Sequence, residues 1–326
     1  MISRQDIAKG IEKARAGGYT VFAPVERDGL VLLEQVADAG AIHLDHVLTV
    51  NGLKDVLMPR RERLAGLELE KSAVVAAEEE TGPIAVFGSR PCDAAALVIL
   101  DAILLGPISD SRYRRQRERT TIVTVACSRC DEACFCTSMG YGPHDATGSD
   151  VLLLPAGGGF AVRGLSAKGK AFLEAAGLGE DSGAAGADPP PELKRKLDTE
   201  GLKTWLDGNF GSDRWRAVSE SCVSCGTCAY LCPTCHCFDI TDEVSLSRGE
   251  RLRIWDCCSF ANFTKMAGHQ PRLGRHARYR QRVMHKFAYC PDNCGKVACV
   301  GDGRCIRHCP YGVDIREVIE SLLGKR

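Results

Sequence analysis

Apolar positions in the first part of the chain alternate between helical spacing and strand-like runs. The opening segment predicts a helix that ends at Ala16 and is capped by Ser3 or Asp6, with two glycines behind it. Residues 19–26 and 30–36 are β-branched and apolar and flank an Arg-Asp-Gly turn. This pattern predicts a helix followed by a β-hairpin.

Three more apolar segments predict strands further along. Residues 84–88 lead directly into a proline and a long apolar helix, which places Cys92 at a helix N-terminus. The helix dipole favours a thiolate there, so Cys92 is a candidate ligand. Residues 121–126 end in a loop rich in cysteine and glycine, a position typical of functional residues. Residues 151–155 and 160–163 flank three glycines and predict a second hairpin.

Mixed strands and helices make residues 1–176 an α/β domain. Residues 177–191 are rich in Gly, Ala and Pro and are predicted to be a linker. Residues 192–326 are predicted to form a second, mainly α-helical domain. It is expected to open with helices at residues 192–206 and 212–221.

Composition narrows the class of protein. The chain has 326 residues, of which 44% are hydrophobic, enough for about two domains. Its 18 cysteines and a polar N-terminus without a signal pattern favour free thiols that bind metal in the cytoplasm. No apolar run approaches the roughly 18 residues of a membrane-spanning helix, so no membrane span is expected.

Charge argues against nucleic acid as a partner. The formal net charge is zero, although residues 248–286 carry ten Lys or Arg and two acidic residues. A basic segment complements anionic thiolate clusters and can also dock an acidic partner. Binding of nucleic acid would need those charges on one stripe with stacking aromatic residues.

The central motif is C-x2-C-x2-C-x3-C-P, formed by Cys222, Cys225, Cys228 and Cys232 and followed by Pro233. This is the spacing with which bacterial ferredoxins hold four-iron clusters, and its fourth cysteine ligates a second cluster. A partner run is therefore expected.

The partner run begins at Cys299 and continues through Cys305 and Cys309, with Asp302 where the second cysteine is expected. The 66 residues between Cys232 and Cys299 exceed the spacing of a small two-cluster ferredoxin. They are predicted to pack beside the clusters, which makes residues 192–326 a mainly α-helical, ferredoxin-like dicluster domain.

Crossed ligation assigns two [4Fe-4S] clusters. The first takes Cys222, Cys225, Cys228 and Cys309; the second takes Cys232, Cys299 and Cys305 with one undecided ligand. Three alternatives stay open for that site: ligation by the oxygen of Asp302, a [3Fe-4S] cluster, or ligation by Cys290 or Cys294.

Two other interpretations of these cysteines have weaker support. Structural zinc prefers two separated C-x2-C knuckles, whereas the knuckles here overlap. The C-x3-C-x2-C triplet of a radical enzyme occurs at residues 228–235, but it lies inside the ferredoxin-like run and far from the N-terminus.

Five ordered motifs carry a resemblance across nearly the whole chain. They are R-P-C-D-A-A-A-L (90–97), C-F-C-T-S-M-G (134–140), C-P-T-C-H-C-F-D-I (232–240), R-I-W-D-C-C-S-F (253–260) and R-Q-R-V-M-H-K-F (280–287). The set resembles the iron-sulfur family that contains the iron-sulfur subunit of anaerobic sulfite reductase and the beta subunit of sulfhydrogenase, a cytoplasmic nickel-iron hydrogenase.

The resemblance implies a non-catalytic electron-transfer subunit. Such a protein relays electrons from or to a subunit that binds flavin and nicotinamide, with a catalytic subunit of hydrogenase, sulfite reductase or heterodisulfide reductase type at the other end. The alternative is a reductase that binds a substrate or flavin in its own α/β domain. Cysteines in the family-like motifs also suggest a third [4Fe-4S] cluster, with Cys92, Cys136, Cys235 and Cys258 as ligands and Cys134 and Cys237 as further candidates.

Overall fold

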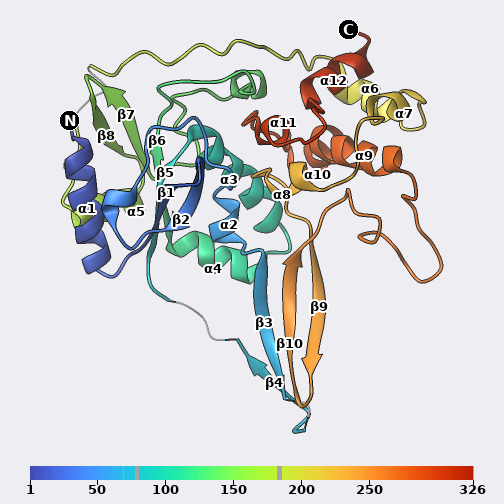
Figure 1. Cartoon of the computed structure of the whole chain (residues 1–326), viewed down its shortest axis with the longest axis horizontal. Coiled ribbons are helices and arrows are strands. Elements are labelled where there is room, and N and C mark those ends of the chain that lie inside the picture. The colour runs from blue at the N-terminus through green and yellow to red at the C-terminus, as the bar shows by residue number, and fades with distance from the viewer. Residues whose placement is uncertain (69, 78–80, 182–185, 326) are drawn as a thin grey trace. The chain divides into compact units, whose positions relative to one another are not determined.

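The structure is a computed structural model that describes residues 1–68, 70–77, 81–181 and 186–325. It divides into two compact units (Figure 1). Unit 1 comprises Met1–Leu57, Gly82–Asp198 and Cys299–Arg304; unit 2 comprises Met58–Thr81, Thr199–Ala298 and Cys305–Arg326. The expected domain boundaries at residues 176 and 192 stay a prediction, and residues 182–185 of the expected linker lie outside the described residues.

Unit 1 is built on a six-stranded sheet with strand order β2-β1-β5-β6-β7-β8. The four central strands run parallel and the two edge strands are antiparallel to their neighbours. The strands are β1 (Thr20–Arg27), β2 (Leu30–Gln35), β5 (Ile84–Ser89), β6 (Thr120–Val125), β7 (Val151–Ala156) and β8 (Gly159–Gly164). The predicted α/β character of the N-terminal region is confirmed.

Helices cover this sheet because its strands are apolar on both faces. One face, including Ala85 and Phe87, shares a core with α1 (Arg4–Ala16) and α5 (Ala167–Ala176). Side chains alternate along a strand, so Ile84 and Val86 point to the opposite face. The remaining helical segments are η1 (Ala39–Ala41), α2 (Lys54–Leu57), α3 (Pro91–Leu104), α4 (Ser111–Arg119) and η2 (Cys136–Met139).

Local signals in the sequence explain the boundaries of several elements. Helix α1 starts with a capping box between Ser3 and Asp6, as predicted. Asp28 and Gly29 adopt φ of 50° and 78°, which suits the tight turn between β1 and β2. Pro91 occupies the first turn of α3, so Cys92 lies at a helix N-terminus as expected.

The distant segment Cys299–Arg304 lies against residues 133–136 within unit 1. The amide of Phe135 donates to the carbonyl of Gly301 at 2.9 Å. Gly301 and Gly303 have φ of 66° and 77°, and a Cβ on either would lie 2.4–2.5 Å from backbone atoms of Ala133 or Phe135. Glycine is therefore required at both positions for this close approach.

Unit 2 contains a four-stranded antiparallel sheet with order β4-β3-β10-β9. Its strands are β3 (Arg61–Glu68), β4 (Ala73–Ala76), β9 (Phe238–Ser245) and β10 (Arg248–Trp255). The prediction of a mainly helical C-terminal region did not include the β9–β10 hairpin. That hairpin turns at Leu246, which adopts φ of 51° without a glycine.

The helices of unit 2 are short apart from one long run. The run joins α9 (Arg275–Met284), a π-helical turn η3 (His285–Tyr289) and α10 (Cys290–Cys294). The others are α6 (Leu202–Gly208), α7 (Arg214–Val218), α8 (Thr227–Tyr230), α11 (Arg304–Arg307), whose first residue belongs to unit 1, and α12 (Ile315–Leu323). None of the helices in the described ranges is long and apolar enough to cross a membrane.

The expected helix at residues 192–206 is wrong in its first half. Residues 192–201 are not helical, and α6 begins only at Leu202. Gly201 has φ of 76°, a left-handed conformation that a helix does not continue through. Ahead of it, Leu197 is buried and its amide donates to Ser138 Oγ at 2.8 Å. Packing of this extended segment therefore overrides its helical propensity. Within the helix expected at residues 212–221, only Arg214–Val218 are helical, as α7.

Candidate metal centres

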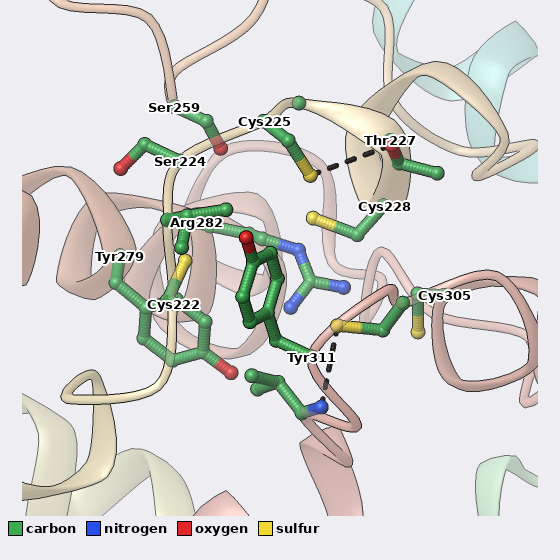
Figure 2. A pocket seen from close by; sticks show the side chains of 14 residues that line it. Cys222, Ser224, Cys225, Thr227, Cys228, Ser259, Tyr279, Arg282, Cys305 and Tyr311 are labelled. Atoms are coloured by element: carbon green, nitrogen blue, oxygen red, sulfur yellow. Dashed lines mark hydrogen bonds between the residues drawn. The ribbon is translucent and has the colours of Figure 1, made fainter.

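One cavity in unit 2 is lined by five cysteines (Figure 2). Three come from α8 and the loop that leads into it, and two from α11 and the turn after it: Cys222, Cys225, Cys228, Cys305 and Cys309. The cavity has about 430 Å³ of space that atoms do not fill, including its opening to solvent. The four residues predicted to ligate the first cluster thus surround one cavity, together with Cys305, which was predicted for the second.

The loop before α8 is shaped by two left-handed residues. Ser224 has φ of 59° and Gly226 has φ of 80°. A Cβ on Gly226 would lie 2.7 Å from the ring of Phe260, so this position needs glycine for space as well as for conformation. Polar contacts also hold two of the sulfurs, because Cys225 Sγ contacts Thr227 Oγ1 at 3.4 Å and the amide of Val313 donates to Cys309 Sγ at 3.2 Å.

Two buried donors from α9 line the same cavity. Arg282 is 3% exposed, and Figure 2 shows its guanidinium pointing into the cavity near Cys228 and Cys305. Burial opposes its charge, but these two thiols together raise the pKa of Arg282 well above its usual value. Its Nε and the hydroxyl of Tyr279 have no hydrogen-bond partner among the described residues. Unsatisfied buried donors are rare and call for a missing acceptor.

The donor set fits a four-iron cluster. Thiolates are the ligands of such clusters, and the sulfurs surround a space that is open in the middle. An anionic cluster would also accept from the unpaired Nε of Arg282 and the hydroxyl of Tyr279. Among the described residues, no three His, Cys, Asp or Glu side chains are close enough together to hold a single metal ion.

Cys232, the fourth cysteine of the first run, has a different environment. It is 6% exposed, and the buried Nζ of Lys286 donates to its sulfur at 3.1 Å. Hydrogen bonding with Cys235 and the charge of Lys286 outweigh burial and hold the pKa of Cys232 well below its usual value. Lys286 also donates to Thr234 Oγ1 at 3.1 Å. A buried ammonium beside a buried sulfur favours the thiolate form that binds metal.

The other residues predicted for the second cluster are distributed between the units. Cys299 and Asp302 belong to unit 1, and Cys232 and Cys305 to unit 2. The carboxylate of Asp302 is buried and pairs with Arg304 at 3.0 Å. The alternative ligands Cys290 and Cys294 lie one turn apart in α10, with their sulfurs 3.1 Å apart. The ligand set of this cluster stays a prediction.

The third set of candidate cysteines is also distributed between the units. Cys235, Cys237 and Cys258 belong to unit 2. Cys92, Cys134 and Cys136 belong to unit 1, where they line one cavity together with Cys127 and Cys130. Neither Cys127 nor Cys130 was among the predicted ligands, although the run C-x2-C-x3-C-x-C at residues 127–136 was visible in the sequence.

Comparison with known proteins agrees with the chemistry of these sites. Residues 221–313 match the family model of the 4Fe-4S dicluster domain. The chain is 30% identical to sulfhydrogenase 2 subunit beta of Pyrococcus furiosus over 313 residues, which cover 93% of this chain and 92% of that protein. No solved structure shows a significant match to the chain.

Proposed function

The chain belongs to the family of sulfhydrogenase beta subunits, and from this premise we propose that it is an iron-sulfur electron-transfer component of a multi-subunit oxidoreductase. In this role it has no substrate chemistry of its own. It passes electrons between two partner subunits, one that binds flavin and nicotinamide and one that is catalytic and of hydrogenase, sulfite reductase or heterodisulfide reductase type. The chain binds the clusters, fixes the distances between them and sets their reduction potentials.

The observation that carries the proposal is the cavity of five thiols with two unpaired buried donors from α9. A bound four-iron cluster supplies reversible one-electron redox chemistry. The protein supplies the thiolates and the surrounding polarity. The Nε of Arg282 and the hydroxyl of Tyr279 are placed to donate to sulfur, and a buried positive charge favours the reduced, more negative state.

We assign the first cluster to Cys222, Cys225, Cys228 and Cys309. We assign the second to Cys232, Cys299 and Cys305, with the fourth position supplied by Asp302, Cys290 or Cys294 or left without a protein ligand in a three-iron cluster. Lys286 supports this assignment, since its ammonium neutralises a thiolate at Cys232. Arg304 competes with iron for the Asp302 carboxylate.

Anaerobic purification of the full chain tests the function. Iron and acid-labile sulfide are quantified, and electron paramagnetic resonance spectra are recorded before and after reduction with dithionite. We expect iron and sulfide in equal amounts, signals that appear on reduction, and no bound flavin. A three-iron signal in the isolated protein would identify the incomplete ligand set of the second cluster.

Two results contradict the proposal. Zinc without iron or sulfide would replace it with a structural role for the thiols. Stoichiometric flavin, together with turnover by the chain alone, would make the protein a reductase in its own right. The partners are sought by retrieving the tagged chain with its native complex, where we expect one subunit with flavin and another that is catalytic.

A further inference from the structure

A second cysteine-lined cavity lies entirely within unit 1. Five thiols from three segments line it: one at the start of α3, three in the loop between β6 and η2, and one at the start of η2, namely Cys92, Cys127, Cys130, Cys134 and Cys136. Its unfilled space is about 350 Å³, comparable with the roughly 430 Å³ of the unit 2 cavity. The two cavities therefore have the same donor chemistry and a similar size.

Short-range hydrogen bonds fix the loops that carry these thiols. The amide of Cys127 donates to the carbonyl of Pro143 at 2.9 Å. The carboxylate of Asp131 accepts from the amides of Ala133 and Cys134 at 3.0 and 3.2 Å. The thiols are thus held by an ordered backbone, as a cluster site requires.

A buried cation in the same cavity has an unused donor. Arg90 is 3% exposed and lines the cavity. Its terminal nitrogens donate to the backbone carbonyls of Val125 at 3.2 Å, of Leu44 at 3.1 Å and of His46. Its Nε has no hydrogen-bond partner among the described residues. No carboxylate within those residues forms an ion pair with its guanidinium. Burying the guanidinium charge without an ion pair is unfavourable unless an anion lies next to it.

The start of α3 adds to this positive field. Arg90 is the N-cap residue of this 14-residue helix, and Cys92 lies in its first turn. The positive end of the helix dipole and the guanidinium both favour negative charge at the cavity. A thiolate-bound iron-sulfur cluster carries net negative charge and therefore fits this positive field.

Five thiols exceed the four that a cubane cluster takes. Cys130 and Cys134 are in hydrogen-bonding contact with each other. Thiolates bound to different irons of one cluster stand apart across it, so this touching pair provides a single ligand. The remaining three positions belong to the thiols that lie outside the pair.

We propose that unit 1 holds a four-iron cluster of its own, ligated by Cys92, Cys127, Cys136 and one member of the pair Cys130 and Cys134. The ligands of this site all come from unit 1, so it does not draw on the candidates Cys235, Cys237 and Cys258 of unit 2. The protein then carries three clusters, and the cluster in unit 1 is an additional electron-transfer centre.

Iron content of the full chain tests this site directly. Wild-type protein, loaded anaerobically with iron and sulfide, is expected to contain about twelve irons. Cys127→Ser and Cys136→Ser are each expected to lower this to about eight and to remove one set of reduced-state resonance signals. Cys130→Ser and Cys134→Ser are expected to keep about twelve irons singly and to fall to about eight only when combined.

The single variants Cys130→Ser and Cys134→Ser control for misfolding. If either substitution disrupted the fold, iron would already be lost in that single variant and not only in the double variant. Signals of the remaining clusters and the far-ultraviolet circular dichroism spectrum check that Cys127→Ser folds. Wild-type protein with about eight irons, or a Cys127→Ser variant with unchanged iron, overturns the proposal. So does zinc bound at these cysteines without sulfide.

The result is distinguishable from failure of the proposed function. If the two clusters assigned to the dicluster domain do not exist, the wild-type protein contains only about four irons, those of the unit 1 cluster. Cys127→Ser then removes those four irons. Failure of the unit 1 site instead leaves about eight irons that Cys127→Ser does not alter.

Discussion

The guanidinium of Arg304 donates to both carboxylate oxygens of Asp93, with Nη1–Oδ1 and Nη2–Oδ2 distances of 2.6 and 3.1 Å. Arg304 has no exposed surface, and it also pairs with Asp302 at 3.0 Å. Its Nε donates to the carbonyl of Thr49 at 3.0 Å. This network fastens the segment Cys299–Arg304 to the first turn of α3, next to Cys92.

Replacing Arg304 is expected to destabilise unit 1 strongly. Arg304→Gln removes the cation that contacts the two buried carboxylates, which costs about 3–5 kcal/mol of unfolding free energy. Denaturant unfolding of the two proteins measures the difference. The matched control is Arg61→Gln, which breaks an exposed pair with Glu243 at 2.9 Å and is expected to leave the midpoint almost unchanged. Equal effects of the two substitutions would contradict the importance of the buried network.

The close approach at Gly303 gives a second prediction. Gly303→Ala places a Cβ 2.4 Å from the carbonyl oxygen of Ala133, at a residue with φ of 77°. Gly29→Ala is a matched control, since Gly29 has φ of 78° and open space around its Cβ position. Both variants lose the left-handed freedom of glycine, but only Gly303→Ala must also move the backbone. We expect Gly303→Ala to cost about 2 kcal/mol more in denaturant unfolding, and similar losses would disprove the backbone contact.

Arg282 is expected to tune the cluster of the unit 2 cavity. Arg282→Gln removes a buried positive charge that favours the reduced state, so the reduction potential should become more negative. A charged hydrogen bond of about 1.5–3 kcal/mol corresponds to a shift of roughly 60–130 mV for one electron. A redox titration followed by electron paramagnetic resonance measures it.

The control for that shift lies on the same helix. Arg280→Gln makes the same change in charge, but Arg280 stacks on the ring of Phe210 at 3.7 Å and donates to the Phe210 carbonyl at 2.9 Å. It does not line the cavity. A potential that moves equally in both variants would show that only net charge matters.

His46 makes stability depend on pH. Burial, reinforced by the charge of Arg90, lowers the pKa of His46 to about 3, and its Nδ1 bonds the carbonyl of His43 at 2.9 Å. The folded protein keeps this ring neutral, whereas the unfolded chain takes up a proton below pH 6.5. The stabilisation is therefore complete above pH 6.5 and is lost progressively as the pH falls from there toward 3.

The loss attributable to His46 is about 2 kcal/mol at pH 5. His46→Gln removes the titrating group, so its unfolding free energy should fall less between neutral pH and pH 5. Parallel curves for the two proteins would mean that the ring is protonated in the folded state.

Features encoded by neighbouring residues were predictable from sequence. The Asp28-Gly29 turn fixed the first hairpin, and Pro91 marked the start of α3. The spacing of Cys222, Cys225 and Cys228 predicted a shared site because a short loop brings such residues together whatever the rest of the fold does.

Features that depend on tertiary structure were not predictable in the same way. Leu246 forms a hairpin turn without the glycine or asparagine that usually announces one. Cys92 and Cys127 meet because β5 and β6 are adjacent parallel strands, so their loops emerge at the same edge of the sheet. No fixed sequence spacing expresses that adjacency, so the cysteine run at residues 127–136 could be recognised in the sequence but its position beside Cys92 could not.

The late return of the chain to unit 1 has a consequence for its biosynthesis. Asp93 leaves the ribosome 211 residues ahead of Arg304, the cation that neutralises it. While residues 299–304 are still to be made, unit 1 contains an acidic group without the cation that pairs with it and lacks one wall of its cysteine cavity. A nascent chain that stalls before residue 299 cannot complete either the ion pair or that wall. The site proposed in unit 1 therefore takes its final form late, only after residues 299–304 have been made.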